Sequence, residues 1–416
     1  MSHGLLIVVA AAAAATVTIA QVPAAGSGQA ASPTSRPGQR PVGTAPAPYY
    51  PDRFDWQRQT AEQARLDGAK LDAAVKFSVA SENPGNKDLA IDLATSFGRE
   101  PFDTPIGPVK SRGALSGIII KNGYVVAEWG DTTRVDMTFS VTKSFLSTLV
   151  GLIWQKGLIR DLTDPVKDYM PAGDAAALFE SPHNAKITWE HLLRQTSDWQ
   201  GTIWGKPDWA DRPEGQTPAD WPNRKLSEPG TRYKYNDARV NVLALAALHV
   251  LRRPLPEFLR DEVMEPIGAS STWRWHGYEN SWIDLDGRRV QSMTGGGHWG
   301  GGMFISARDM ARFGYLFLRN GKWKDRQIVS QKWIDMARSA GPANDGYGYM
   351  NWFLNSGAKP AFPNAPRSAV TFQGNGSNIV YIDWDNDLVV VVRWIRQNAF
   401  NEFIGQVLGS LPGTAR

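Results

Sequence analysis

Apolar residues gather in short runs near both ends of the chain, and turn residues join these runs in pairs. Residues 113–130 read GALSGIIIKNGYVVAEWG, in which two β-rich runs flank Asn122-Gly123. An Asn-Gly pair in this position is the strongest short signal for a β-hairpin, because both residues tolerate positive φ. Residues 378–395, NIVYIDWDNDLVVVVRWI, predict a second hairpin. Strands are therefore expected in the N-terminal and C-terminal thirds of the chain.

Helical spacing of apolar residues dominates between the two hairpins. The pattern predicts helices at residues 71–79, 144–155, 189–194, 237–251 and 306–319. Ser306 and Asp309 have the spacing of a capping box at the start of the last helix. A further helix is expected after the second hairpin, with one apolar face made of Phe400, Phe403, Ile404, Val407 and Leu408.

These elements predict an α+β fold, in which one antiparallel sheet is assembled from both ends of the chain and flanked by helices. The sheet subdomain is expected at about residues 53–137 and 286–416, and a mainly helical subdomain is expected to be inserted at about residues 138–285. A catalytic cleft would lie at the seam between the two.

The first 20 residues, MSHGLLIVVAAAAAATVTIA, have the apolar stretch and the small residues of a cleavable export signal. Residues 21–52 are rich in Pro, Ala, Gly and Ser, which predicts a flexible segment. We expect a periplasmic or secreted protein without a stable membrane partner after signal removal. No Lys or Arg precedes the apolar stretch, so an uncleaved membrane anchor stays open as the alternative.

Composition narrows the chemistry. A chain of 416 residues with 42% hydrophobic residues can bury a large core. The net charge of +4 comes from scattered Lys and Arg, which argues against a nucleic-acid partner. The chain has no cysteine, which excludes a thiol nucleophile and thiolate metal sites. Its six histidines show no metal-binding spacing, so neither a metal nor a cofactor is expected.

Ser140 and Lys143 stand three residues apart at the start of the apolar helix, in FSVTKSFLSTLVG. This spacing puts both side chains on one helical face, and a lysine desolvated against an apolar wall could take the serine proton. The helix N-terminus would add N–H donors for an oxyanion. The alternative is a serine that caps the helix and a lysine that reaches the solvent; the position after a hairpin favours the nucleophile.

A second polar group should pass the proton to the leaving group. Tyr235 precedes a predicted helix, in Tyr235-Asn-Asp237, and is the preferred relay. The similar triplets at Tyr278 and Tyr349 compete with it, and a packed core tyrosine is the structural alternative.

With these motifs in place, the chain resembles the serine hydrolases of the β-lactamase and penicillin-binding-protein superfamily, especially the class C-like branch of esterases and 6-aminohexanoate-dimer hydrolases. The resemblance spans residues 71–408 and includes HLLRQTSDWQG, GGGMFISARDMARFGYLFLRNGKW and GNGSNIVYIDWDNDLVVVVRW in the expected order. It implies a β-lactamase-like fold, with Ser140 as the acylated nucleophile, Lys143 as its base and Tyr235 as the proton relay.

The expected function is hydrolysis of small esters or amides through an acyl-enzyme. The alternatives are β-lactamase or D,D-peptidase activity, or a catalytically silent exported binding protein with the same fold.

Two departures from the family pattern concern the substrate. Asp237 stands where many relatives carry asparagine, and Gln373-Gly374-Asn375-Gly376 replaces the Lys-Thr-Gly of penicillin binders. A lysine that would hold a substrate carboxylate is therefore absent from this strand, and β-lactams are expected to be poor substrates. The second oxyanion N–H is expected from Asn375, with Gly376 as the alternative.

A loop rich in tryptophan, residues 197–222, is a candidate substrate wall through Trp199 and Trp204. Indoles that pin the loop to the core are an equally good interpretation. Asp198 and Asp208 could contact a substrate amine, but a capping or turn role is the preferred interpretation.

Overall fold

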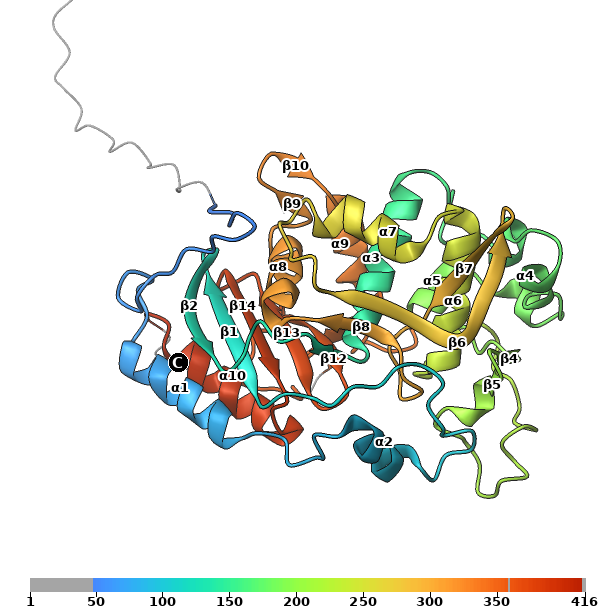
Figure 1. Ribbon diagram of the computed structural model, residues 1–416, viewed down its shortest axis with the longest axis horizontal. Coiled ribbons are helices and arrows are strands. Elements are labelled where there is room, and N and C mark those ends of the chain that lie inside the picture. The colour runs from blue at the N-terminus through green and yellow to red at the C-terminus, as the bar shows by residue number, and fades with distance from the viewer. Residues whose placement is uncertain (1–47, 358–359, 414–416) are drawn as a thin grey trace, which may run out of the picture. The chain divides into compact units, whose positions relative to one another are not determined.

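Six antiparallel strands form the central sheet of the computed structural model, which describes residues 48–357 and 360–413 (Figure 1). Across the sheet the strands are β11 (Trp352–Phe353), β12 (Val370–Gly374), β13 (Asn378–Asp383), β14 (Leu388–Arg393), β1 (Ser116–Lys121) and β2 (Tyr124–Trp129). The first predicted hairpin therefore pairs with the second, with Ile118 opposite Val391. The assembly of one sheet from both ends of the chain is confirmed.

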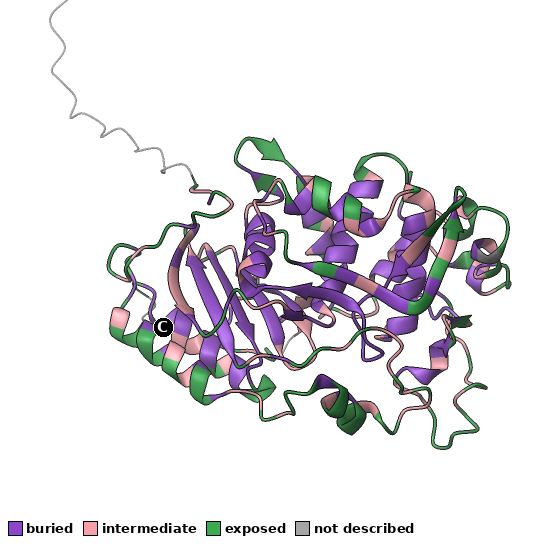
Figure 2. Ribbon diagram, in the orientation of Figure 1, coloured by how far each residue is buried: buried purple, intermediate pink, exposed green. Residues whose placement is uncertain are grey.

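Helices cover both faces of this sheet. On one face lie α1 (Gly68–Ala80) and α10 (Phe400–Gly409), which contact each other although they come from opposite ends of the chain (Figure 1). On the other face lies α8 (Ala307–Leu318). The strands of β1 and β14 are continuous apolar runs because side chains on both faces are buried (Figure 2).

Local signals in the sequence explain where these elements turn and begin. Asn122 and Gly123 both have positive φ, 53° and 91°, as the two-residue turn requires. The buried face of α10 consists of the five predicted residues. Ser306 caps α8, but the capping box is wrong in its second half: the Asp309 carboxylate accepts from the N–H and hydroxyl of Ser270 instead.

A smaller antiparallel sheet lies beside the central one. Its strand order is β3 (Asp136–Met137), β8 (Gly302–Ile305), β6 (Arg274–Leu285) and β7 (Arg288–Met293). Two short hairpins are added, formed by β4 (Thr202–Ile203) with β5 (Lys206–Pro207) and by β9 (Lys322–Trp323) with β10 (Arg326–Gln327). Because β3 pairs with β8 directly before Ser140, this sheet fixes the approach to the predicted nucleophile.

The remaining part is mainly helical and centres on α3 (Val141–Gln155), which packs against α6 (Asp237–Leu251) and β12. Leu158 and Gly157 close α3 by donating to the carbonyls of Ile153 and Trp154, which is a Schellman motif. The other α-helices are α2 (Leu89–Phe97), α4 (Asp174–Ala177), α5 (Trp189–Leu193), α7 (Leu255–Leu259) and α9 (Gln331–Ala337). Single 3₁₀ or π turns occur at Val166–Tyr169, Asn184–Lys186, Asp208–Ala210, Arg260–Met264 and Gln397–Ala399.

Some predictions about organisation stay predictions. The expected signal peptide and all but the last residues of the flexible segment lie outside the described residues. The bounds of the two subdomains are also untested, although residues 138–285 hold strands β4, β5 and β6 beside the helices. Among the described residues, we find no helix with both the length and the apolar character needed to cross a bilayer.

Candidate active site

The turn into α3 presents the hydroxyl of Ser140 to a cavity. Phe139, the residue before it, is buried with φ of 49°, a left-handed conformation that costs energy in a bulky residue. Its carbonyl accepts a 2.6 Å hydrogen bond from Thr142 Oγ1, which fixes the turn. Ser140 makes no side-chain capping bond to the helix, so the alternative of a simple cap does not describe its hydroxyl.

The amine nitrogen of Lys143 contacts the serine hydroxyl. Its Nζ donates to Ser140 Oγ over 2.8 Å and to the carbonyl of Gly295 over 3.2 Å. It also lies 2.6 Å from Oδ1 of Asp237, and both side chains of this ion pair are almost completely buried. The expected apolar wall around Lys143 is therefore wrong, because a carboxylate and a carbonyl surround the amine.

The phenol of Tyr235 completes the group around Ser140. Lys143 Nζ lies 5.0 Å from the centre of the Tyr235 ring. Burial raises the pKa of Tyr235 far above its ordinary value and nearby Asp237 raises it further, while a hydrogen bond with Ser140 acts in the opposite direction. Tyr235 is thus a neutral phenol at neutral pH, able to donate a proton. The competing tyrosines point elsewhere: Tyr278 bonds to Asn241, and Tyr349 bonds to Glu190.

Asp237 lies under the cavity in a buried polar network. Its Oδ2 is 3.2 Å from Nδ1 of His298 and 3.4 Å from Nη1 of Arg212. Burial alone would raise the pKa of the Asp237 carboxyl, but the charges of Lys143 and Arg212 hold that pKa well below its ordinary value. The predicted contact of Asp237 with substrate does not fit this position; the carboxylate faces Lys143.

Two more carboxyl groups border this network. Asp211 accepts from the backbone N–H of Asp237 and pairs with Arg212. Burial raises the pKa of Asp211, and the charge of Asp237 raises it further. Burial also raises the pKa of Glu100, whose Oε2 is 3.5 Å from His298 Nε2.

Donor atoms of Glu100, Asp211 and His298 lie within 4.8 Å of one another, which is close enough for shared ligation of a metal ion. These groups already have partners within the chain: Asp211 binds Asp237 and Arg212, Nδ1 of His298 bonds to Asp237, and Glu100 accepts from the backbone N–H of Arg212. These contacts account for the cluster, and we assign it no metal.

The end of β12 lies against the nucleophile turn. A Cβ atom on Gly374 would lie 2.1 Å from the Thr138 carbonyl oxygen and 3.2 Å from the Ser140 nitrogen, so only glycine permits this approach. The next residue, Asn375, therefore follows close to the Ser140 turn. In the part of the chain that the structure describes, neither the Ser140 N–H nor the Asn375 N–H donates to a protein acceptor. Both remain available for an oxyanion.

The cavity beside Ser140 has a volume of about 460 Å³. Its lining includes the predicted site residues Ser140, Tyr235, Gln373, Gly374, Asn375 and Gly376. Its aromatic walls are Phe97 and Trp352, and the Trp352 ring stacks on Tyr235 with centroids 5.7 Å apart. Residues that complete the lining are Asn83, Arg212, Ser377, Ile379 and Gln397.

The tryptophans predicted as a substrate wall do not line this cavity. Trp199 is buried in the core, where its indole N–H donates to the carbonyl of Leu178. Trp204 is half-buried against the same core. The pinned-loop interpretation therefore describes these indoles, because the loop folds back on the helices. Asp198 and Asp208 are likewise structural, since both form buried ion pairs with Arg239.

Sequence analysis missed two parts of this site. Arg212 lines the cavity, whereas the sequence analysis found no cation on the strand that carries Lys-Thr-Gly in penicillin binders. Nothing in its loop marks it, because only the fold brings it beside Tyr235. The run Gly295-Gly296-Gly297-His298 is the second part, and three consecutive glycines were a usable signal. Gly296 has φ of 73°, and a Cβ there would lie 2.3 Å from the Phe139 oxygen.

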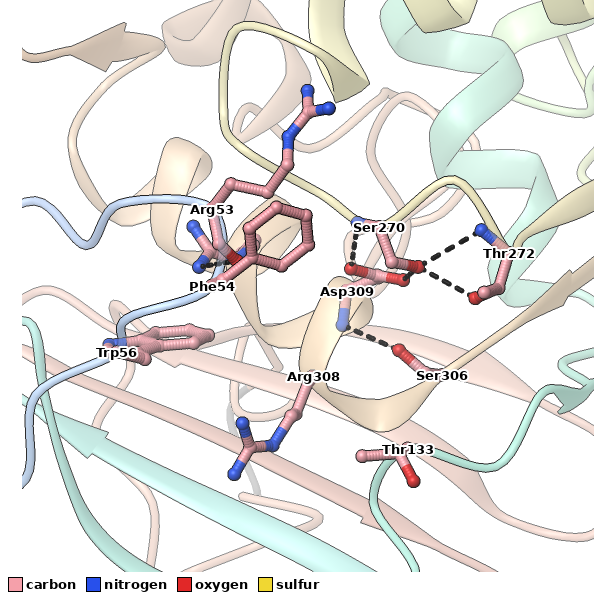
Figure 3. A pocket seen from close by; sticks show the side chains of 10 residues that line it. Arg53, Phe54, Trp56, Thr133, Ser270, Thr272, Ser306, Arg308 and Asp309 are labelled. Carbon is pink, nitrogen blue, oxygen red and sulfur yellow. Dashed lines mark hydrogen bonds between the residues drawn. The ribbon is translucent and has the colours of Figure 1, made fainter.

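A separate cavity of about 230 Å³ lies near the start of α8 (Figure 3). Figure 3 shows Asp309 bonded to Ser270 and to the cap Ser306, and Arg308 is paired with Glu128. The polar groups drawn there stabilise the fold. The cavity at Ser140 is the better candidate, because there a nucleophile, a cation, a phenol and free N–H groups converge.

Comparisons with known proteins agree with this geometry. The model of the Beta-lactamase family matches residues 109–401. The 6-aminohexanoate-dimer hydrolase of Paenarthrobacter ureafaciens is 27% identical over 224 residues, which are 49% of this chain and 51% of that protein. The chain thus matches about half the length of this curated relative.

Two solved structures share the fold. A candidate beta-lactamase from Bacteroides dorei superposes with a TM-score of 0.53 at 14% identity, covering 82% of this chain and 96% of its own. The hydrolase EstCE1, described as having promiscuous acyltransferase activity, gives a TM-score of 0.50 at 16% identity, covering 82% and 99%. The β-lactamase-like α+β fold expected from the sequence is confirmed.

Proposed function

The chain belongs to the beta-lactamase family, and we propose that it is a serine hydrolase that cleaves small esters or amides through an acyl-enzyme on Ser140. The observation that carries the proposal is the 2.8 Å contact between Lys143 Nζ and Ser140 Oγ beside an open cavity. A serine hydroxyl is a weak nucleophile until a neighbour removes its proton, and Lys143 is the basic group in contact with it.

In the first step, Ser140 Oγ attacks the substrate carbonyl while its proton passes to a neutral Lys143 amine. The ammonium that forms lies beside the ionised Asp237, 2.6 Å away. Asp237 thereby stabilises positive charge as it develops, much as the aspartate of a Ser-His-Asp triad stabilises the imidazolium. The substrate oxygen becomes negative and accepts from the N–H groups of Ser140 and Asn375.

Collapse of this intermediate breaks the ester or amide bond. Tyr235 donates its phenolic proton to the departing alcohol or amine and regains one from Lys143. The acyl group now remains on Ser140. Water then attacks the acyl carbonyl and gives a proton to Lys143 and Tyr235. These groups return the proton to Ser140 Oγ as the acid leaves. Removing one oxyanion donor typically costs about 10²- to 10³-fold in kcat.

The substrate class is drawn from the cavity and the relatives. Phe97, Tyr235 and Trp352 offer aromatic walls for a short apolar chain. One relative is named a hydrolase of the 6-aminohexanoate dimer. These observations support linear esters and amides as substrates, and esters need less assistance for their leaving group.

Hydrolysis of β-lactams is the second candidate, because Arg212 in the cavity lining could bind the carboxylate of a β-lactam. Against it, Gln373 stands where penicillin-binding relatives carry a lysine, and its neutral amide is a weaker partner for a carboxylate. To decide, kcat/KM for 4-nitrophenyl butyrate and for nitrocefin should be measured on one preparation, with Ser140→Ala as the blank. We expect the ester to react faster; faster turnover of nitrocefin would overturn the assignment.

We further propose that the protein is exported to the periplasm or secreted. The support is the apolar stretch within residues 1–20. Mass spectrometry of the protein recovered from the native cell envelope or medium tests this. A mature N-terminus near residue 21 is expected, and an intact first segment would instead favour the membrane anchor.

A further inference from the structure

The cavity beside Ser140 carries one kind of charge. Among the described residues that line it, Arg212 is the charged one, and the others are aromatic, aliphatic, hydroxyl or amide side chains and glycines. Lys143, Asp211 and Asp237 lie close by, but each is buried and none lines the cavity. A ligand in this space therefore meets a guanidinium and no carboxylate.

Arg212 still has hydrogen-bond donors to offer. Both of its ion pairs, with Asp211 and Asp237, use Nη1. In the part of the chain that the structure describes, Nε and Nη2 have no hydrogen-bond partner, and the side chain is 38% exposed. These two nitrogens form the edge of a guanidinium that binds a carboxylate with two parallel bonds.

Aromatic rings hold the guanidinium in place. Its carbon lies 5.1 Å from the centre of the Tyr235 ring and 5.8 Å from that of Phe97. Tyr235 also neighbours Lys143, and Arg212 and the nucleophile Ser140 line the same cavity. Contacts of this kind with aromatic faces restrain an arginine before its ligand arrives, which reduces the entropy lost on binding.

The carboxyl groups near Arg212 do not line the cavity. Asp237 is also paired with Lys143, and Asp211 also accepts from the backbone N–H of Asp237. Burial raises the pKa of Asp211, and the charge of Asp237 raises it further. Glu100, which accepts from the backbone N–H of Arg212, does not line the cavity either. Among the described lining residues, Arg212 therefore presents the charge to a ligand.

We propose that Arg212 is a substrate-binding residue that selects esters or amides bearing an anionic group, in the first place a carboxylate. This inference rests on the proposed function of Ser140. The aromatic walls would hold the short chain between the reacting carbonyl and the carboxylate. Substrates with an ammonium group in the same place should be disfavoured, because the lining offers them no counter-charge.

The test compares three esters of one length on the unaltered enzyme. They are the mono(4-nitrophenyl) ester of adipic acid, its neutral methyl ester, and 4-nitrophenyl 6-aminohexanoate. We expect kcat/KM to be about 10- to 100-fold higher for the carboxylate than for the methyl ester, the range for a charge-assisted hydrogen bond, with most of the gain in KM. The ammonium ester should be the poorest. A second pair, 4-carboxyphenyl and 4-carbamoylphenyl hexanoate, moves the carboxylate to the leaving group.

Substitutions at Arg212 test whether this residue causes the preference for the carboxylate ester. Arg212→Gln should lower kcat/KM for the carboxylate ester about 10- to 100-fold more than for the methyl ester, so that the advantage of the carboxylate is lost. Arg212→Lys should keep part of the advantage, because it retains charge but loses the two-bond edge. Arg326→Gln, an exposed arginine on β10, is the matched control and should change neither value.

The outcomes separate the two proposals. Equal kcat/KM for the charged and neutral members of both ester pairs would overturn the role of Arg212 while leaving Ser140 as the nucleophile. Parallel loss of both activities in a folded Arg212→Gln would mean a structural role and also overturn it. If that variant does not fold, competitive inhibition of the wild type decides: hexanoate should inhibit at least ten-fold more strongly than hexylamine, and the reverse order would contradict the inference. Absence of hydrolysis of every ester would instead contradict the proposed function.

Discussion

Nζ of Lys143 lies 2.6 Å from Oδ1 of Asp237 and 2.8 Å from the hydroxyl of Ser140. The lysine that contacts the nucleophile is therefore held by a buried carboxylate on its other side. Asp237 is therefore placed to stabilise the positive charge that Lys143 gains when it takes the serine proton.

Replacing this carboxylate by its neutral isostere should lower kcat. In Asp237→Asn the ammonium that forms in the first step loses its counter-charge, and we expect kcat to fall by about 10- to 100-fold. Folding stability should fall by about 3 kcal/mol, as for breaking a buried pair. Steady-state kinetics with 4-nitrophenyl butyrate and denaturant unfolding measure the two effects.

Asp208→Asn is the matched control for that experiment, because Asp208 is also in a buried ion pair but binds Arg224 and Arg239. It should lower stability by a similar amount without the same loss of kcat. An unchanged kcat in a folded Asp237→Asn would show that the carboxylate does not assist Lys143.

The losses of kcat caused by removing the nucleophile and by removing its base should not be additive. We predict that Ser140→Ala abolishes hydrolysis, that Lys143→Ala lowers kcat by nearly as much, and that the double variant is hardly worse, because the two groups act as one unit. Steady-state kinetics with circular dichroism as the folding control measure this. A folded Lys143→Ala enzyme with most of its activity would remove the lysine from the mechanism.

Tyr235→Phe should lower kcat by about 10²- to 10⁴-fold, the range for a positioned proton donor, with little change in KM. The hydroxyl is the group removed, so the ring contacts with Trp352 stay. Tyr349→Phe is a useful comparison, because its hydroxyl bonds to Glu190 outside the cavity. Near-normal turnover in Tyr235→Phe would transfer the relay to water or to another residue.

The contribution of Glu128, on the outer strand β2, to folding stability should depend on pH over a limited acidic range. Although burial acts in the opposite direction, hydrogen bonds from Arg308, Thr132 and Arg58 lower the pKa of Glu128 to about 2. An unfolded glutamate titrates at about 4.3, so the stability gained from Glu128 is complete above that pH and is lost as pH falls toward 2.

In Glu128→Gln we therefore expect a loss of up to about 3 kcal/mol at pH 7 and a weaker dependence of stability on pH between about 4.3 and 2. Denaturant unfolding at several pH values measures both. The same acid dependence in wild type and variant would show that Glu128 is not responsible.

Local patterns revealed most of the fold. The two hairpins, α6 and the buried face of α10 follow from turn residues and apolar period, because those signals act over a few neighbouring positions. Ser140 and Lys143 are also a local pair, three residues apart on one helix. Their meeting could be expected before any tertiary structure was known.

Contacts between segments far apart in the chain could not be predicted from the sequence. The charge beside Lys143 comes from the start of α6, and Gly295 comes from the chain after β7. Trp199 was expected at the substrate but fills the core, because an indole satisfies either environment and only the packing decides. Arg212 reached the cavity through a loop whose composition gave no signal.

Covalent labelling decides whether the site is catalytic or a silent binding site on the same fold. The purified protein should be treated with a fluorophosphonate at neutral and alkaline pH, and the intact mass and the modified peptide determined for wild type, Ser140→Ala and Lys143→Ala. We predict one adduct, on Ser140, which forms much more slowly in Lys143→Ala and is absent from Ser140→Ala. A folded wild-type protein that gains no adduct at either pH, or gains one on another residue, would contradict the assignment of Ser140 as the nucleophile.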